Sequence, residues 1–177
     1  MATNAYKNII FIGCGGSLGS VLLKSLLSEP TFHVTVLTRE SSKARISIPS
    51  TASVVTIDDS YPLEDLIKAC KGQDVVVNAI TSFSVAEQYK FIDAAIAAGV
   101  ERYVPSEYGL DDNTPEAQEL SHVFKDKGMV QQYLCSKESS GLTWAAIACG
   151  TWIGWSLRNN FLGLDYLSRS ITFTDDG

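Results

Sequence analysis

Histidine is scarce in this chain, and its cysteines are few and scattered. Of 177 residues, two are histidines and four are cysteines, at Cys14, Cys70, Cys135 and Cys149. No two cysteines have the C-x-x-C spacing, and the histidines, His33 and His122, are not clustered with them. The sequence therefore indicates neither a zinc site nor a disulfide framework. We expect all four cysteines to be reduced structural thiols.

Long apolar runs and an excess of basic residues are also lacking. No run approaches the roughly 18 apolar residues of a membrane span, and residues 1–7 lack the basic and apolar regions of a signal peptide. We therefore expect a cytoplasmic protein without a membrane partner. The 14 Lys and Arg face 20 Asp and Glu, for a net charge of −6, which disfavours direct nucleic-acid binding.

The chain is long enough for one domain with a real core, which would bury roughly 70% of the unfolded surface. Apolar runs alternate with stretches of helical period, and residues 111–119 form a polar interruption that we expect to be a surface loop. Strands are predicted at residues 8–12, 33–37, 53–57, 74–80, 102–104 and 142–149. Helices are predicted at residues 17–27, 62–70, 87–98 and 122–138. This alternation predicts an α/β fold with a doubly wound parallel sheet.

A glycine-rich turn joins the first predicted strand to the first helix. Gly13, Gly16 and Gly19 follow the apolar residues 9–12 with G-x-x-G-x-x-G spacing, and Gly15 is an additional glycine. Such a turn lets backbone N–H groups approach a pyrophosphate, and the helix N-terminus adds roughly half a positive charge. We predict a dinucleotide site here, and the wide spacing suggests a reductase or epimerase variant. Its binding residues are Gly13, Gly16, Ser17, Leu18 and Gly19.

The end of the second predicted strand indicates which dinucleotide is bound. In NAD-binding domains a carboxylate at the end of this strand accepts a hydrogen bond from a ribose hydroxyl. Here the sequence has Arg39 instead, followed by Lys43 and Arg45, either of which could assist it. Arginine and lysine suit a 2′-phosphate. NADP (as NADPH) is therefore preferred and NAD is less expected, although Glu40 remains an alternative ribose ligand.

Other cofactor contacts are predicted where later strands end. Asp58 follows the third strand and is either a carboxylate for the adenine amino group or, like Asp59, a turn residue. The fourth strand ends at the carboxyl edge of the sheet, where open α/β sheets bind ligands. Phe83 is either a nicotinamide contact or a packing residue. The predicted contacts at this edge are Ala79, Ile80, Thr81 and Ser82.

Two segments resemble a known family. Residues 88–95 (QYKFIDAA) and 98–109 (AGVERYVPSEYG) are similar to the NmrA-like and isoflavone reductase-like family of atypical short-chain dehydrogenases, especially its fungal members. The likeness extends in order from the glycine turn to residues 141–144 (GLTW). It implies a Rossmann-type fold, NADPH as cofactor and hydride transfer to a small, often aromatic substrate. It also admits NmrA-type regulators, which bind a dinucleotide without turnover and act through protein partners.

The resemblance also assigns roles to residues on the last predicted helix and before it. Lys127 aligns with the family's catalytic lysine, which would hold the ribose hydroxyls of the cofactor and polarise or protonate substrate. The alternative is an ordinary surface lysine. Tyr133 and Lys137 match the Y-x-x-x-K of ordinary short-chain dehydrogenases, but we interpret Tyr133 as a packing residue. Ser106 and Tyr108 are placed near the active end of the cofactor.

Glu107 is expected to brace its loop rather than to transfer a proton. The tryptophans are expected to be core residues rather than an aromatic stripe for substrate; they are Trp144, Trp152 and Trp155.

The resemblance further implies that the chain has two parts, a complete cofactor-binding domain and an incomplete substrate-binding portion. Residues 1–150 form an NAD(P)-binding domain, and residues 151–177 begin a substrate-binding portion that relatives continue, so this portion is expected to be truncated. Such an ending would expose Trp152, Trp155, Phe161 and Leu162 and favour a homo-oligomer or a protein partner. The leading hypothesis is an NADPH-dependent oxidoreductase domain, and the alternative is a non-catalytic redox sensor.

Overall fold

Six parallel strands form one sheet in the order β3-β2-β1-β4-β5-β6. The computed structural model describes residues 6–161 and 163–173. The strands are β1 (Asn8–Ile12), β2 (His33–Arg39), β3 (Ser53–Ile57), β4 (Val75–Asn78), β5 (Arg102–Val104) and β6 (Thr143–Trp144). The chain grows outward from β1 in both directions, so the strand order reverses between β1 and β4. The predicted Rossmann-type, doubly wound sheet is confirmed.

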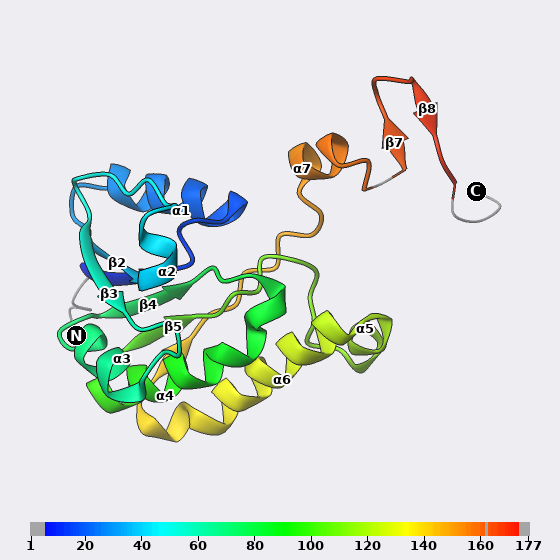
Figure 1. Cartoon of the computed structure of the whole chain (residues 1–177). Coiled ribbons are helices and arrows are strands. Elements are labelled where there is room, and N and C mark those ends of the chain that lie inside the picture. Colours follow the sequence, from blue (N-terminus) through cyan, green and yellow to red (C-terminus); the bar gives the residue numbers. More distant parts are fainter. Residues whose placement is uncertain (1–5, 162, 174–177) are drawn as a thin grey trace.

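Helices cover both faces of this sheet (Figure 1). Helix α1 lies on one face, and α3, α4 and α6 lie on the other. The helices are α1 (Ser17–Ser28), α2 (Glu40–Lys43), α3 (Leu63–Cys70), α4 (Gln88–Ala98), α5 (Pro115–Leu120), α6 (His122–Lys137) and α7 (Ile153–Arg158), with 3-10 turns η1 (Ser82–Glu87) and η2 (Glu138–Ser140).

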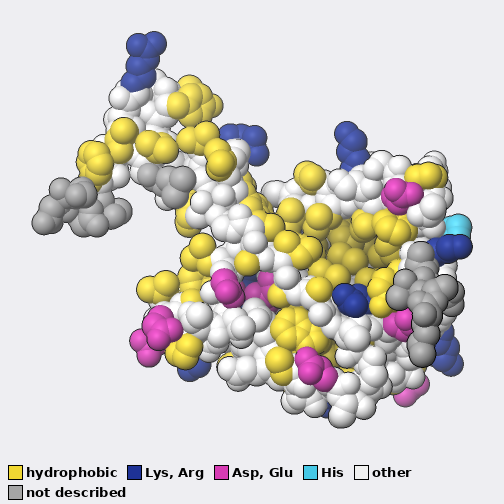
Figure 2. Space-filling model, turned by 180° about the vertical axis from the view of Figure 1, so that it is seen from behind, with side chains coloured by type: hydrophobic (Ala, Val, Ile, Leu, Met, Phe, Trp, Pro, Cys, Tyr) yellow, Lys and Arg dark blue, Asp and Glu magenta, His cyan; other side chains and the backbone are white. Residues whose placement is uncertain are grey.

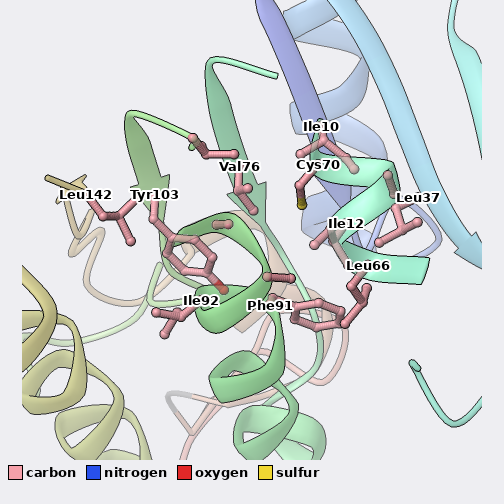
Figure 3. Packing of buried hydrophobic residues seen from close by; sticks show 14 of the residues in the cluster. Ile10, Ile12, Leu37, Leu66, Cys70, Val76, Phe91, Ile92, Tyr103 and Leu142 are labelled. Carbon is pink, nitrogen blue, oxygen red and sulfur yellow. The ribbon is translucent and has the colours of Figure 1, made fainter. Parts of the chain in front are cut away.

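Alternate residues of the strands supply two cores. Ile10 and Ile12 of β1 pack with α3 and α4, whereas Phe11 between them packs with α1, as the two-residue period of a strand requires. Figure 3 shows the larger core, with Phe91 of α4 beside Leu66 of α3. Because each face of the sheet is covered by helices, β1 and β4 read as continuous apolar runs.

One buried hydrogen bond joins β4 to β5 inside this core. Asn78 Nδ2 donates to the hydroxyl of Tyr103 over 3.0 Å. Tyr103 is fully buried, and this burial raises the pKa of its hydroxyl. The bond satisfies the polar end of an otherwise apolar ring.

Two sequence expectations fail in the second half of the chain. The strand predicted at residues 142–149 is confined to Thr143–Trp144, because a turn closed by Glu107 N–H and Pro105 O interrupts the neighbouring chain. Residues 111–119, expected to be a loop, contain most of α5. The side chain of Thr114 caps this helix by accepting a hydrogen bond from Ala117 N, and Pro115 occupies its first turn.

The end of the chain projects away from the sheet (Figure 1). It comprises α7 and an antiparallel hairpin of β7 (Leu164–Asp165) and β8 (Ser170–Ile171). Trp152 and Trp155 are 36% and 37% exposed, so their assignment to the core is wrong, and Trp144 is only half-buried. The other expectation, that Trp152, Trp155 and Phe161 are exposed, is confirmed, whereas Leu162 lies outside the described residues.

The cysteine prediction is confirmed in part. All four are free, but only Cys14 and Cys70 are buried, whereas Cys135 and Cys149 are exposed. None of the helices that the structure describes is long and apolar enough to cross a membrane.

Substitution of Gly19 by alanine tests the close contact at the glycine turn. A Cβ on Gly19 would overlap the carbonyl of Gly13, whereas a Cβ on Gly16 would lie 3.7 Å from the same oxygen, an ordinary contact. We expect Gly19→Ala to lower the free energy of unfolding by about 1–3 kcal/mol and Gly16→Ala to leave it nearly unchanged. Urea denaturation of both variants measures the difference. Equal stability of the two would contradict the contact.

Candidate functional site

A cleft of about 450 Å³ opens where the strand order reverses. It lies at the carboxyl ends of β1, β2 and β4, the position at which open α/β sheets bind ligands. Its walls come from segments far apart in sequence: residues 12–16, 37–39, 42, 45, 46, 59, 61, 79–81, 84 and 87. The fold therefore brings the glycine turn, the end of β2 and the end of β4 to one site.

The glycine turn fits an anionic group. Gly16 N donates to Gly13 O over 3.3 Å, and Gly13 has φ +93°, with its α-carbon against the backbone of Ala79. Gly16 caps α1 without a side chain, and the first turn holds no acidic residue. The first N–H groups of a helix lack intrahelical acceptors, so those of residues 17–19 remain to bind an anion. Gly13 and Gly16 line the cleft. Ser17, Leu18 and Gly19 are not among the lining residues and follow in the first turn of α1.

Two arginines form the basic end of the cleft. Arg39 ends β2, as predicted, and its guanidinium carbon lies 5.9 Å from the centre of the Tyr61 ring, within cation–π range. Arg45 also lines the cleft, and its Nη2 donates to Ser41 O over 2.9 Å. Lys43 is exposed and does not line the cleft. Arg45 therefore occupies the place that the sequence offered to either residue.

The acid at this end of the cleft is Asp59. Its Oδ1 accepts a hydrogen bond from Ser41 N over 3.1 Å, and the hydrogen bonding by Ser41 lowers the pKa of its carboxyl. Asp58 Oδ1 instead accepts from the backbone and hydroxyl of Ser60 over 2.9 and 2.6 Å. These bonds close a turn and lower the pKa of Asp58. Of the two roles predicted for Asp58, an adenine ligand or a turn residue, the structure shows the turn geometry.

The end of β4 forms another wall. Ala79, Ile80 and Thr81 line the cleft as predicted. Ser106 braces this wall, because its hydroxyl donates to Ile80 O over 2.7 Å. Ser82 begins η1 and is not among the lining residues. Phe83 is 91% exposed, so its packing interpretation is wrong.

Lys127 is buried rather than exposed on the surface of α6. Its side chain is 6% exposed, and its Nζ donates to the carbonyl oxygen of Glu107 over 2.6 Å. The ordinary surface role is therefore excluded. Lys127 is not among the residues that line the cleft described above. It binds the segment that braces the wall of the cleft, because Ser106, the residue before Glu107, donates its hydroxyl to Ile80 O over 2.7 Å.

Two carboxyl groups share this buried environment with Lys127. Burial raises the pKa of Glu107 to about 7, against the opposing effects of Lys127 and of the hydrogen bond from Gln131. Burial also raises the pKa of Asp112. Glu107 Oε1 and both Oδ atoms of Asp112 are buried and accept no hydrogen bond from an N–H or hydroxyl group among the described residues. Hydrogen bonding between the two carboxyl groups, which requires a proton on one of them, also raises the pKa of Glu107. One ammonium cannot balance two buried carboxylates, so the cluster retains a proton near neutral pH.

The Tyr133 and Lys137 pair is engaged elsewhere. The hydroxyl of Tyr133 donates to Asp93 Oδ1 over 2.6 Å, and Lys137 Nζ lies 4.7 Å from the centre of the tyrosine ring. Burial raises the pKa of Tyr133, whereas a general acid at neutral pH needs a lowered one. Tyr133 also packs edge-on against Tyr89. The geometry favours the packing interpretation.

The pH dependence of stability tests the buried cluster. The folded pKa of Glu107, about 7, lies above its ordinary value of 4.5. Between pH 4.5 and 7, Glu107 holds a proton in the folded state that it has lost in the unfolded state. The contribution of Glu107 to the free energy of unfolding therefore decreases as pH rises through this range. The comparison is between the parent and Glu107→Gln, which lacks this titrating group. We expect the difference in unfolding free energy, parent minus variant, to decrease as pH rises from 4.5 to 7 and to stay constant above pH 7. Urea titrations at several pH values measure it, and parallel profiles would refute the cluster.

Comparison with known proteins gives the family. The profile of the NmrA-like family matches residues 5–176. Oxidoreductase aprR of Aspergillus flavus is 36% identical over 170 residues, covering 96% of this chain and 56% of that protein. An isoflavone reductase homolog of Solanum tuberosum is 30% identical over 166 residues, covering 86% of this chain and 51% of that protein. The chain thus spans about half the length of these curated relatives.

A solved structure shows the same fold. The structure of AtPrR2 with NADP+ and (+)pinoresinol superposes with a TM-score of 0.69 at 23% identity, covering 89% of this chain and 54% of that one. The resemblance seen in residues 88–109 is thus confirmed along nearly the whole chain. Because the family profile, the relatives and the sheet topology agree, this chain belongs to the NmrA-like family.

Proposed function

We propose that this chain forms the coenzyme-binding part of an NADP-dependent oxidoreductase that transfers hydride to a small, often aromatic, substrate. The observation that carries the proposal is the uncapped N-terminus of α1, which faces a glycine turn at the reversal of strand order. The oxidoreductase and reductase relatives support the reaction class. The solved structure with NADP+ supports the coenzyme.

Different residues of the cleft bind different parts of the coenzyme. Backbone N–H groups of residues 17–19 bind the diphosphate, and Arg39 and Arg45 bind the 2′-phosphate with charge-assisted hydrogen bonds. The wall at Ala79–Thr81 holds the rest of the molecule against the sheet, and Ser106 fixes that wall through Ile80. NADPH, when bound, supplies the hydride. On this proposal residues 1–150 are the NAD(P)-binding domain and residues 151–177 begin the substrate-binding portion.

Lys127 is the proposed catalytic residue on the family resemblance. Its ammonium is desolvated and bound to the loop that follows β5. A buried ammonium can donate a proton to a substrate oxygen. The neighbouring Glu107 and Asp112 retain the proton that would recharge it.

A non-catalytic redox sensor is the second candidate. One observation favours it, namely that Lys127 does not line the cleft and binds a backbone carbonyl instead. A sensor would bind the dinucleotide with the same residues and signal through a protein partner.

Replacement of Arg39 tests the preference for NADPH. We expect Arg39→Ala to raise the Kd for NADPH by about ten- to a hundredfold, the equivalent of roughly 1.5–3 kcal/mol, and to change the Kd for NADH little. Lys43→Ala is the matched control, because Lys43 is a nearby cation that does not line the cleft. Titration by coenzyme fluorescence measures all three proteins. If Lys43→Ala weakens NADPH binding and Arg39→Ala does not, Lys43 rather than Arg39 binds the 2′-phosphate.

Turnover distinguishes the enzyme from the sensor. NADPH oxidation is followed with a panel of aldehydes, ketones and isoflavones. For the enzyme we expect Lys127→Ala to lose about a hundredfold or more of the rate while it still binds NADPH, and Tyr133→Phe to retain the rate. Tight NADPH binding by the parent without oxidation of any substrate would favour the sensor, and loss of rate only in Tyr133→Phe would refute the role of Lys127.

A further inference from the structure

Tyr61 has an unusual backbone conformation for a bulky residue. Its φ is +55°, in the left-handed region that large side chains rarely adopt. Of the four non-glycine residues of the described chain with a positive φ, Tyr61 is the one that lines the coenzyme cleft. Residues held in such conformations are concentrated at active sites and ligand-binding sites, so we examined what the ring of Tyr61 contacts.

The turn that carries Tyr61 is attached to helix α4. Tyr61 N donates to Asp58 O over 3.1 Å, which closes the turn after β3. Lys90 Nζ of α4 donates to Ser60 O over 3.2 Å and lies 2.8 Å from Glu87 Oε2. These contacts fix the backbone of the turn beside the cleft and hold Tyr61 in its left-handed conformation.

The ring of Tyr61 packs on the larger core. It lies edge-on to Phe91 of α4, with 4.9 Å between the ring centres and 82° between the ring planes. Phe91 is 1% exposed and is one of the core residues shown in Figure 3. Because protein cores are close-packed, Phe91 has little freedom to move, and the Tyr61 ring that packs on it has a defined orientation.

The other contact of this ring is with Arg39. The guanidinium carbon lies 5.9 Å from the ring centre, within cation–π range. Burial raises the pKa of the Tyr61 hydroxyl, and the charge of Arg39 opposes this rise. The ion pairs among the described residues all involve lysines, and Asp59 accepts its hydrogen bond from Ser41 N instead. Tyr61 therefore holds the guanidinium while its N–H donors remain available to a ligand.

A second arginine and tyrosine pair provides a contrast. The guanidinium carbon of Arg102 lies 5.7 Å from the centre of the Tyr6 ring. Arg102 Nε, however, donates to Thr143 Oγ1 over 2.8 Å, and neither Arg102 nor Tyr6 lines the cleft. The same type of contact thus serves a structural purpose there, whereas the pair formed by Arg39 and Tyr61 faces a ligand site.

The overall charge of the chain makes the placement of single arginines important. The net charge is −6, and on the face shown in Figure 2 the basic side chains are scattered rather than gathered into one patch. A general positive field therefore does not attract a phosphate group. Recognition of a phosphate depends instead on individual guanidinium groups that are already in position.

We propose that Tyr61 is a positioning residue for coenzyme specificity, because its ring holds the Arg39 guanidinium where it binds the 2′-phosphate of NADPH. This inference rests on the proposed function and adds the group that orients the arginine. A long side chain loses rotamer freedom when it binds a ligand, and an arginine already held by a ring loses less. NADH lacks the 2′-phosphate, so loss of the ring affects the binding of NADPH and not that of NADH.

Two substitutions of Tyr61 test the role of the ring. Tyr61→Asn removes the ring with a residue that tolerates a positive φ, and Tyr61→Phe retains the ring. We expect Tyr61→Asn to raise the Kd for NADPH about three- to tenfold and to leave the Kd for NADH nearly unchanged, and Tyr61→Phe to bind both coenzymes like the parent. The matched control is Tyr6→Asn, which removes the ring of the other pair. Coenzyme fluorescence measures each Kd, and circular dichroism verifies folding.

A double-mutant cycle with Arg39→Ala separates positioning from direct contact with the coenzyme. If Tyr61 acts through Arg39, Tyr61→Asn has no further effect on the Kd for NADPH once Arg39 is alanine. An equal effect in both backgrounds would overturn the inference, as would an unchanged Kd in Tyr61→Asn or an equal loss for NADPH and NADH. A loss in Tyr61→Phe as large as that in Tyr61→Asn would also overturn it, because the hydroxyl would then be the group that matters.

These outcomes are distinguishable from failure of the proposed function. If Arg39→Ala weakens NADPH binding and Tyr61→Asn does not, the inference about Tyr61 is wrong and the proposed coenzyme site stands. If the parent binds NADPH no more tightly than NADH, the proposed coenzyme preference is wrong, and the role of Tyr61 is refuted with it.

Discussion

The close approach of the backbone at Gly13 to the backbone of Ala79 determines the rest of this structure. A side chain at Gly13 would overlap the carbonyl of Ala79, and Ala79 N donates to Ile12 O over 2.8 Å. The contact holds the ends of β1 and β4 together where the strand order reverses. It sets the direction in which α1 begins, and therefore where the helix presents its first N–H groups.

The fold was predictable because its signals are local. Apolar runs of strand length alternate with helical periods, and Gly13, Gly16 and Gly19 mark the first turn. Sequence reasoning could not settle what depends on contacts between segments. The choice of Arg45 over Lys43 depends on how α2 turns back toward the cleft, and the partner of the buried Lys127 lies on the loop that carries Glu107, twenty residues earlier in the chain. One failure was local: Thr114 followed by Pro115 and Glu116 marks the start of α5 in the sequence, but this signal was missed.

The buried polar cluster connects three parts of the second half of the molecule. Lys127 and Gln131 extend from α6, Glu107 from the loop after β5, and the Asp112 carbonyl accepts a hydrogen bond from Gln118 of α5. Buried ions stabilise a fold weakly, but removal of one partner is costly because the other charge stays in the interior. The cluster thus fixes the position of α6 against the β5 loop, whatever its part in chemistry.

The strand order also has a consequence for biosynthesis. A ribosome releases β1, β2 and β3 first, and these three are neighbours at one end of the sheet. The other side of β1 stays open until residues 75–78 emerge and pair with it. Because a nascent chain folds from its N-terminus, the coenzyme cleft cannot be completed until Ala79, Ile80 and Thr81 have left the exit tunnel, however early the glycine turn has formed.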